Sequence, residues 1–341
     1  MNSLPIDLIQ YFIFDKLNFI TQIRFRQICK KFNRVDIHNL CYNIGWKYLD
    51  KLSDTILINY PKVKYLKAIN NKKITNINHM TNLQILDASG YYCGLDDNGI
   101  KNLNLIKLYA KHNPKITNIN HMTNLQILDA SGYCGIDDTG IKNLNLIELY
   151  AYNNTKITNV NHMTNLQILD ASYHCGIDDN GIKNLNLIQL CAFNNPNIKN
   201  VNHMTNLKIL NASGYYCGLD DNAIKNLNLI ELYAKHNPKI TNINHMNKLQ
   251  KLIASGGDCG LDDNGIKDLN LIELNASHNS KITNVNHMTN LQILDASENC
   301  GINDNDIKNL NLIELYINNN KIIKNISHMT NLRILNGIYI R

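Results

Sequence analysis

The sequence predicts an α/β solenoid of about 14 short turns, in which each turn adds one strand to a parallel sheet on the concave face. The main support is an internal period, because a His-Met pair recurs every 42 or 41 residues along most of the chain. A second observation is that each period holds two half-units of similar apolar spacing. The pairs begin at His79, His121, His162, His203, His245, His287 and His328.

Each half-unit is expected to supply one strand and one return segment. Alternate residues of a strand point to opposite faces, so the Leu and Ala side chains face the core while their neighbours face outward. We expect this array to fill residues 63–341. In the period that starts at His121, the core-facing residues are Leu125, Leu128 and Ala130 in the first half, and Leu146, Leu149 and Ala151 in the second.

The half-units resemble the leucine-rich repeat, L-x-x-L-x-L-x-x-N/C-x-L, at the short end of its length range. The first half-unit resembles the cysteine-containing subtype common in F-box proteins, with Tyr133 in the frame and Cys134 one place late. The Asn of the second half-unit is expected to bond buried backbone groups where the chain leaves the strand. This Asn recurs at Asn71, Asn113, Asn154, Asn195, Asn237, Asn279 and Asn320.

Residues 1–40 do not fit the repeat and resemble the F-box motif, L-P-x-E-L-L-x-x-I-F-x-x-L followed by V-C-K-x-F/W. The resemblance implies a small helical domain that docks a Skp-type adaptor, which bridges to a cullin ubiquitin ligase. Residues 41–62 are expected to form a helical linker or N-terminal cap. The expected adaptor contacts are Leu4, Pro5, Leu8, Ile9 and Ile13.

Acidic pairs close each first half-unit, as at Asp137 and Asp138. Each pair precedes a short apolar turn. The sequence predicts that the second aspartate caps a helical turn by accepting bonds from its first free N–H groups. Calcium binding is the alternative, although the EF-hand spacing is absent.

Histidine and cysteine also recur once per period, which could suggest a metal site or disulfides. Neighbours in such a column are about 9.6 Å apart, twice the strand spacing. A disulfide needs Cα atoms within about 7 Å, and two imidazoles on one zinc ion must converge. We therefore expect free cysteines, structural histidines and no cofactor. Catalytic motifs are absent as well, so the sequence predicts a protein without enzymatic activity.

The net charge of +6 is concentrated at the start of the chain. Residues 1–80 hold 13 basic and 5 acidic residues, while the remainder holds 21 and 23. The repeats as a whole therefore lack a field suited to a phosphate backbone, and no nucleic-acid partner is expected. Without an apolar stretch of about 18 residues or a basic leader, we expect no membrane partner and a cytoplasmic location.

The chain contains 60 asparagines and is also rich in Ile, Lys and Tyr, a bias typical of a very AT-rich genome. With its near-identical repeats, it resembles F-box/leucine-rich-repeat families expanded in large DNA viruses of amoebae or in AT-rich protists. A viral origin would imply the host cytoplasm.

A target protein is expected on the outward face of the strands, where aromatic anchors lie among polar residues. Copying of these residues by tandem duplication, without selection for binding, is the alternative. The chain would then be either the substrate receptor of a Skp/cullin/F-box ubiquitin ligase, or an interaction solenoid whose N-terminal helices only cap the stack. The candidate target-binding residues are Tyr109, Tyr150, Tyr152, Phe193, Tyr233 and Tyr316.

Overall fold

The computed structural model describes residues 39–40 and 52–340. The chain divides into two compact units, with unit 1 ending at Leu166 and unit 2 beginning at Gln167. Both units are built from the same kind of turn. Outside the described residues lie nearly all of the F-box-like segment and its expected adaptor contacts, Leu4, Pro5, Leu8, Ile9 and Ile13.

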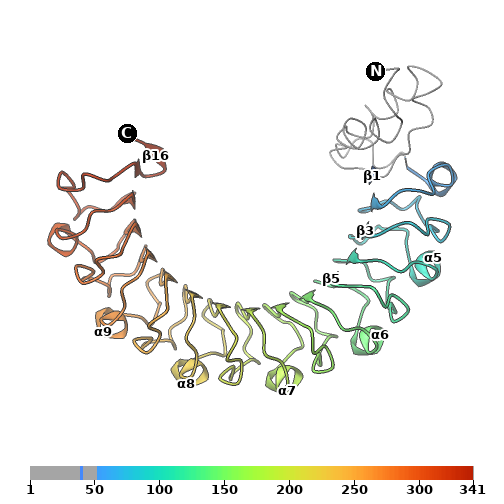
Figure 1. The fold of residues 1–341 in the computed structure, drawn as a ribbon, viewed down its shortest axis with the longest axis horizontal. Coiled ribbons are helices and arrows are strands. Elements are labelled where there is room, and N and C mark those ends of the chain that lie inside the picture. Colours follow the sequence, from blue (N-terminus) through green and yellow to red (C-terminus); the bar gives the residue numbers. More distant parts are fainter. Residues whose placement is uncertain (1–38, 41–51, 341) are drawn as a thin grey trace, which may run out of the picture. The chain divides into compact units, whose positions relative to one another are not determined.

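Each turn contributes one short strand, and the short helices lie on the opposite side of the turn (Figure 1). In unit 1 the strands are β1 (Asn39–Leu40), β2 (Tyr65–Lys67), β3 (Ile85–Asp87), β4 (Lys107–Tyr109), β5 (Ile127–Asp129) and β6 (Glu148–Tyr150). The helices of unit 1 are α4 (Asp54–Leu57), α5 (Asp97–Ile100) and α6 (Asp138–Ile141).

Unit 2 continues the same alternation of strands and helical turns. Its strands are β7 (Ile168–Asp170), β8 (Gln189–Cys191), β9 (Ile209–Asn211), β10 (Glu231–Tyr233), β11 (Lys251–Ile253), β12 (Glu273–Asn275), β13 (Ile293–Asp295), β14 (Glu314–Tyr316), β15 (Ile334–Leu335) and β16 (Ile338–Tyr339). Its helices are α7 (Asp179–Ile182), α8 (Asp221–Ile224), α9 (Asp263–Ile266) and the 3-10 turn η3 (Asp304–Asp306).

Apart from β16, the strands within each unit pair in parallel and in register, so that equivalent residues of successive turns lie side by side. Leu108 of β4 pairs with Leu128 of β5, and both side chains are fully buried. Every three-residue strand buries its middle leucine and half-buries the two flanking residues. Burial of one such leucine contributes about 2 kcal/mol, and the repeated column forms the core. Strands β2 to β15 correspond to the 14 turns that the sequence predicts.

The sheet begins before the expected start of the array near Val63. Strand β1 pairs in parallel with β2, with Leu40 beside Leu66. Residues 52–62 were expected to belong to a linker or cap. Their helix α4 carries Asp54, which bonds Thr75 just as equivalent aspartates bond the following turn elsewhere. The described part of this segment therefore has the geometry of a repeat turn.

The difference between the 42-residue and the 41-residue periods has a local cause. Ala88 and Cys93 enclose a loop one residue longer than the loop between Ala130 and Cys134, and the longer loop occurs in each 42-residue period. The strands and the core are unaffected, because both cysteines are buried. The cysteine, and not the adjacent Tyr133, fills the core position of the first half-unit, so the predicted frame was wrong by one residue. Tyr133 is 68% exposed because the loop turns its side chain outward.

The chain leaves each of the strands β2 to β13 through a residue with a positive φ angle two positions after the inward-facing Ala. Gly256 takes this position with a φ of 101°, and an added Cβ there would lie 2.3 Å from the ring of His236. Asn and His fill most of the non-glycine positions. Tyr173 and Glu298 are less suited to this conformation, at φ 57° and 62°.

Replacing Glu298 with glycine is expected to raise the free energy of unfolding by about 0.5–1 kcal/mol, because glycine relieves the steric cost of positive φ. The substitution also removes an exposed hydrogen bond from Asn319 to the Glu298 carboxylate, which offsets a few tenths of a kcal/mol. Urea denaturation measures the change. Asn299→Gly is the matched control at a neighbouring exposed residue without positive φ, where glycine should destabilise. An unchanged or lowered stability of Glu298→Gly would contradict the assignment.

The sheet of unit 2 ends in a hairpin. Strand β16 pairs antiparallel with β15, and Asn336 and Gly337 make the turn with φ angles of 52° and 80°. Asn-Gly is the preferred pair for such a two-residue turn. Ile338 and Tyr339 on β16 are 67% and 78% exposed.

Candidate functional site

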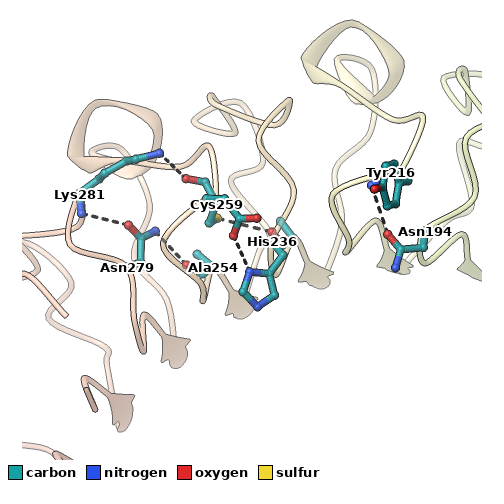
Figure 2. A network of polar contacts seen from close by, with 9 residues as sticks. Asn194, Tyr216, His236, Ala254, Cys259, Asn279 and Lys281 are labelled. Carbon is teal, nitrogen blue, oxygen red and sulfur yellow. Dashed lines mark hydrogen bonds and ion pairs between the residues drawn. The ribbon is translucent and has the colours of Figure 1, made fainter. Parts of the chain in front are cut away.

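The recurring asparagine is a structural residue, as the sequence predicts. Asn279 is fully buried, and its Nδ2 donates to the carbonyl oxygen of Ala254 at 2.9 Å (Figure 2). The same Nδ2 donates to the carbonyl oxygen of Leu261 at 3.0 Å. Its Oδ1 accepts from the backbone N–H of Lys281 at 3.0 Å. One side chain thus satisfies three backbone groups of two turns. The same bonding recurs at Asn113, Asn154, Asn195 and Asn237.

The two aspartates of each acidic pair make different hydrogen bonds from those that the sequence predicts. The first aspartate is the helix cap, since the carboxylate of Asp137 accepts from Gly140 N–H at 3.0 Å. The second aspartate reaches the next turn instead, where Asp138 accepts from the backbone N–H groups of Thr158 and Asn159. It also accepts from the Thr158 hydroxyl at 2.5 Å. The predicted N-cap was therefore wrong by one residue, because the cap must precede the first helical residue.

Polar columns on the helical side also join successive turns. The ring Nε2 of His121 donates to the carbonyl oxygen of Ile100 at 3.3 Å, at the end of helix α5. Asn120 Nδ2 donates to the Thr139 carbonyl at 2.7 Å. Equivalent bonds occur through most of the array, so the histidine column is structural. Among the described residues, no cluster of three or more His, Cys, Asp or Glu could hold a metal ion.

The cysteine column is free of disulfides in the described residues, and most of its thiols are buried. Burial raises the pKa of Cys259 to about 11, so its thiol stays protonated at neutral pH. Its Sγ lies 3.5 Å from the Ala234 carbonyl oxygen. Its own carbonyl accepts from Lys281 Nζ at 2.7 Å, as Figure 2 shows. Protonated and enclosed thiols of this kind are unsuited to nucleophilic chemistry.

The strand face of unit 1 combines tyrosine with carboxylates. Tyr109 ends β4 and is half-buried. Partial burial raises its pKa first, and the negative charges of Asp87, Glu148 and Asp129 raise it further. Tyr150, at the end of β6, donates its hydroxyl to Glu148 at 3.0 Å. The face therefore presents neutral phenols among negative charges.

The strand face of unit 2 repeats this arrangement with a larger excess of acid. Tyr233 and Tyr316 donate their hydroxyls to Glu231 and Glu314 at 3.0 and 3.2 Å. The side chains of β10 to β14 that face outward include four carboxylates and one ammonium. The ammonium is already paired, since Lys251 Nζ lies 2.9 Å from Glu273. The remaining carboxylates are Glu231, Asp295 and Glu314.

Two of the candidate aromatic residues lie beyond the strands. Tyr152 and Phe193 follow β6 and β8 in the loops that leave the strand face. Lys111 Nζ lies 5.7 Å from the ring centre of Tyr152. Phe193 packs edge-to-face against Tyr173 at 4.9 Å. The structure thus separates the six candidates into four on the strand faces and two on the loops.

Sequence reasoning missed a set of exposed aromatic side chains in the loops. Tyr91, Tyr92, Tyr133, Tyr215 and Tyr216 lie in the loops after first-half strands and are 49–75% exposed. Tyr216 N–H donates to Asn194 Oδ1 at 3.2 Å, which holds this loop against the neighbouring turn (Figure 2). Their position between a turn-forming Gly and the core Cys could have indicated this exposure, because a bulky side chain there cannot enter the core.

No protein-family model and no curated protein matches the sequence. Solved structures do match. An internalin from Listeria monocytogenes is 17% identical, with 93% of this chain and 94% of that chain covered and a TM-score of 0.49. The functional domain of InlJ from Listeria monocytogenes, described as including a cysteine ladder, is 21% identical, with coverages of 82% and 64% and a TM-score of 0.48.

A structure of TLR13 with ssRNA13 is 18% identical, with 82% of this chain and 46% of that chain covered and a TM-score of 0.50. This chain therefore spans less than half of the TLR13 chain. At such identity the likeness shows the fold alone and says nothing of what this chain binds. With the leucine and asparagine columns, it confirms that the described residues form a leucine-rich-repeat solenoid.

In the described part of the chain, no helix is long and apolar enough to cross a membrane.

Proposed function

We propose that the protein is a receptor that holds a target protein on the strand faces of its repeats. The observation that carries this is the row of half-buried tyrosines whose hydroxyls are held by glutamates, as at Tyr233 and Tyr316. Such side chains are already ordered, so a partner gains contact area at small entropic cost. Columns of polar contacts in place of a single cluster favour a binding scaffold over an enzyme.

The target segment is proposed to be basic. Strands β10 to β14 present Glu231, Asp295 and Glu314 beyond the paired Lys251 and Glu273. Lysine or arginine side chains would meet both carboxylates and the faces of the tyrosine rings. Opposite charge would also accelerate encounter, so association should slow as salt rises.

The proposed destination of the target is a ubiquitin ligase. This step rests on the F-box resemblance of residues 1–40, in which Leu4, Pro5, Leu8, Ile9 and Ile13 would contact a Skp-type adaptor and through it a cullin. We propose that the protein would meet that ligase in the cytoplasm, and in the host cytoplasm if the source is viral. The alternative is an interaction solenoid without a link to ubiquitin.

A capture experiment with three forms of the full chain separates these roles. Tagged wild type, Leu8→Asp with Ile9→Asp, and Tyr233→Ala with Tyr316→Ala are incubated with a eukaryotic lysate, and bound proteins are identified by mass spectrometry. The first double variant should lose adaptor and cullin but keep the target, because charge is placed on the docking residues. The second should lose the target by tenfold or more, since aromatic anchors carry about 2 kcal/mol each or more.

Circular dichroism of all three forms is the control for folding. If wild type captures neither adaptor nor cullin, the ubiquitin role is excluded and the solenoid alternative holds. If adaptor capture survives Leu8→Asp with Ile9→Asp, the assignment of the docking residues is wrong. If no captured protein depends on Tyr233 and Tyr316, the strand face of unit 2 is not the recognition surface.

A further inference from the structure

The loops that follow the strands of unit 1 carry basic residues and no acidic ones, whereas the strand face carries both. We define the loop edge of unit 1 as residues 68–74, 88–95, 110–116, 130–136 and 151–157. It carries no Asp or Glu, whereas the strands carry Asp87, Asp129 and Glu148 together with Lys67 and Lys107. The near-neutral sum over the repeats conceals this local basic edge. Its lysines are all exposed and are Lys72, Lys73, Lys111, Lys115 and Lys156.

Exposed rings lie on the same edge. Tyr91 and His112 stack with their centres 5.0 Å apart and their planes 21° apart. Tyr133 lies 6.1 Å from Tyr91 and 6.3 Å from His112. Tyr91, Tyr92 and Tyr133 are 49%, 75% and 68% exposed. The rings come from three successive turns, so they form a short row along the axis of unit 1.

Lysines and tyrosines alternate from turn to turn along this edge. The loops after β2, β4 and β6 carry the lysines, and the loops after β3 and β5 carry Tyr91, Tyr92 and Tyr133. Neighbouring turns are about 4.8 Å apart, so lysine-bearing turns recur about every 9.6 Å. A partner that matches this edge has negative charge and planar faces that both repeat along its length.

We propose that the loop edge of unit 1 binds single-stranded nucleic acid, with Tyr91 and Tyr133 stacking on bases and the lysines contacting phosphates. Single strands expose their base faces, and aromatic side chains in a basic surface are the usual means of binding them. An acidic protein segment would match the lysines but supply no regular planar groups. Protein interfaces also tend to be depleted of lysine. This surface is separate from the strand faces assigned to a target protein.

The rings and the absence of acid are not copied into every turn. In the last turns of unit 2 the equivalent loops, residues 254–261, 276–282, 296–302 and 317–323, contain no Tyr or Phe. The same loops contain Asp258 and Glu298. Earlier loops of unit 2 behave differently, since residues 212–219 and 234–240 repeat the rings and lysines of residues 88–95 and 110–116 without Asp or Glu. The pattern therefore continues from unit 1 into unit 2 and is lost only in the last turns.

The test is fluorescence anisotropy of the full chain with labelled single-stranded RNA and DNA of about 12 nucleotides, within the usual site size. Tyr91→Ala with Tyr133→Ala should weaken binding at least about tenfold, because each stacked base is worth about 1–3 kcal/mol. Lys111→Ala with Lys156→Ala should reduce the slope of log K against log salt by about 1.4, since each phosphate contact on a single strand contributes about 0.7.

Matched variants keep the inference falsifiable. Lys101→Ala with Lys142→Ala removes the same charge beside the helices α5 and α6, and Tyr109→Ala removes a ring from the strand face. Both should bind oligonucleotide as wild type does. The proposal is overturned if neither oligonucleotide binds, or if the control variants weaken binding as much as the edge variants do. It is also overturned if a poly-glutamate peptide of equal charge binds as tightly as the oligonucleotide.

Discussion

Replacing Asn279 with alanine is expected to lower the free energy of unfolding by at least about 3 kcal/mol. The substitution removes both hydrogen bonds from Nδ2 to the Ala254 and Leu261 carbonyls and the bond from Lys281 N–H to Oδ1. The side chain is fully buried, so water does not replace these partners. Each buried polar group left without a partner costs about 1–3 kcal/mol.

A graded series at this position tests the explanation. Cysteine occupies the equivalent place in first half-units, where Cys259 Sγ approaches the Ala234 carbonyl at 3.5 Å. Asn279→Cys keeps one weak donor and should cost less than Asn279→Ala. Asn279→Asp places a carboxylate oxygen against two carbonyl oxygens and should cost at least as much as alanine.

Urea denaturation, with hydrogen exchange in the flanking turns, measures this series. The control is Asn290→Ala, because Asn290 is exposed and its loss should change stability by no more than about 0.5 kcal/mol. Equal effects of Asn279→Ala and Asn290→Ala would show that the buried bonds contribute little. Because a solenoid is stabilised by neighbour contacts, exchange should rise first in the turns beside residue 279.

The fold could be predicted from the sequence because the same residues recur at a fixed spacing along the chain. The leucine column and the asparagine column each specify a position in the turn, and their spacing leaves little freedom for the chain between them. The structure also gives many of the 60 asparagines a role, as in the bond from Asn120 to the Thr139 carbonyl. Genome composition alone does not explain such columns.

The candidate binding surfaces were harder to predict from the sequence, because they depend on how the loops orient their side chains. An alternating pattern tells which residues of a strand face outward, and this located Tyr109, Tyr150, Tyr233 and Tyr316. It does not tell how the three or four residues between the core Ala and the core Cys turn their side chains, so Tyr133 was assigned to the core frame. Net charge summed over the repeats likewise hid a basic loop edge in unit 1 and an acidic strand face in unit 2.

The acidic pairs show that comparison between turns could have separated two roles. The first position holds Ser53, Asp96, Asp137, Asp178, Asp220, Asp262 and Asn303, and the second holds Asp54, Asp97, Asp138, Asp179, Asp221, Asp263 and Asp304. Ser, Asp and Asn are all suitable residues at a helix N-cap, which matches the variation of the first position. A group that must accept several bonds from the next turn needs two carboxylate oxygens, which matches the constancy of the second.

Asp138→Ala is therefore expected to destabilise unit 1 by about 2 kcal/mol, and Asp137→Ala by about 1 kcal/mol. The larger effect follows because Asp138 accepts from Thr158 N–H, Asn159 N–H and the Thr158 hydroxyl, and so joins two turns. Asp137 accepts from Gly140 N–H within its own turn and from the Thr139 hydroxyl. The expected loss of stability for Asp138→Ala is near the middle of the range for hydrogen bonds to a charged group, because the bonds of Asp138 are exposed to solvent.

Amide hydrogen exchange distinguishes the two aspartates beyond their stabilities. Asp138→Ala should speed exchange at Thr158 and Asn159, one turn further along the chain, whereas Asp137→Ala should speed exchange at Gly140 in its own helix. Asp138→Asn retains one acceptor oxygen, so its effect should lie between those of wild type and alanine. If the two alanine variants gave the same stability and the same exchange pattern, the carboxylate of Asp138 would not couple the turns. Packing of the leucine column would then be sufficient to hold one turn against the next.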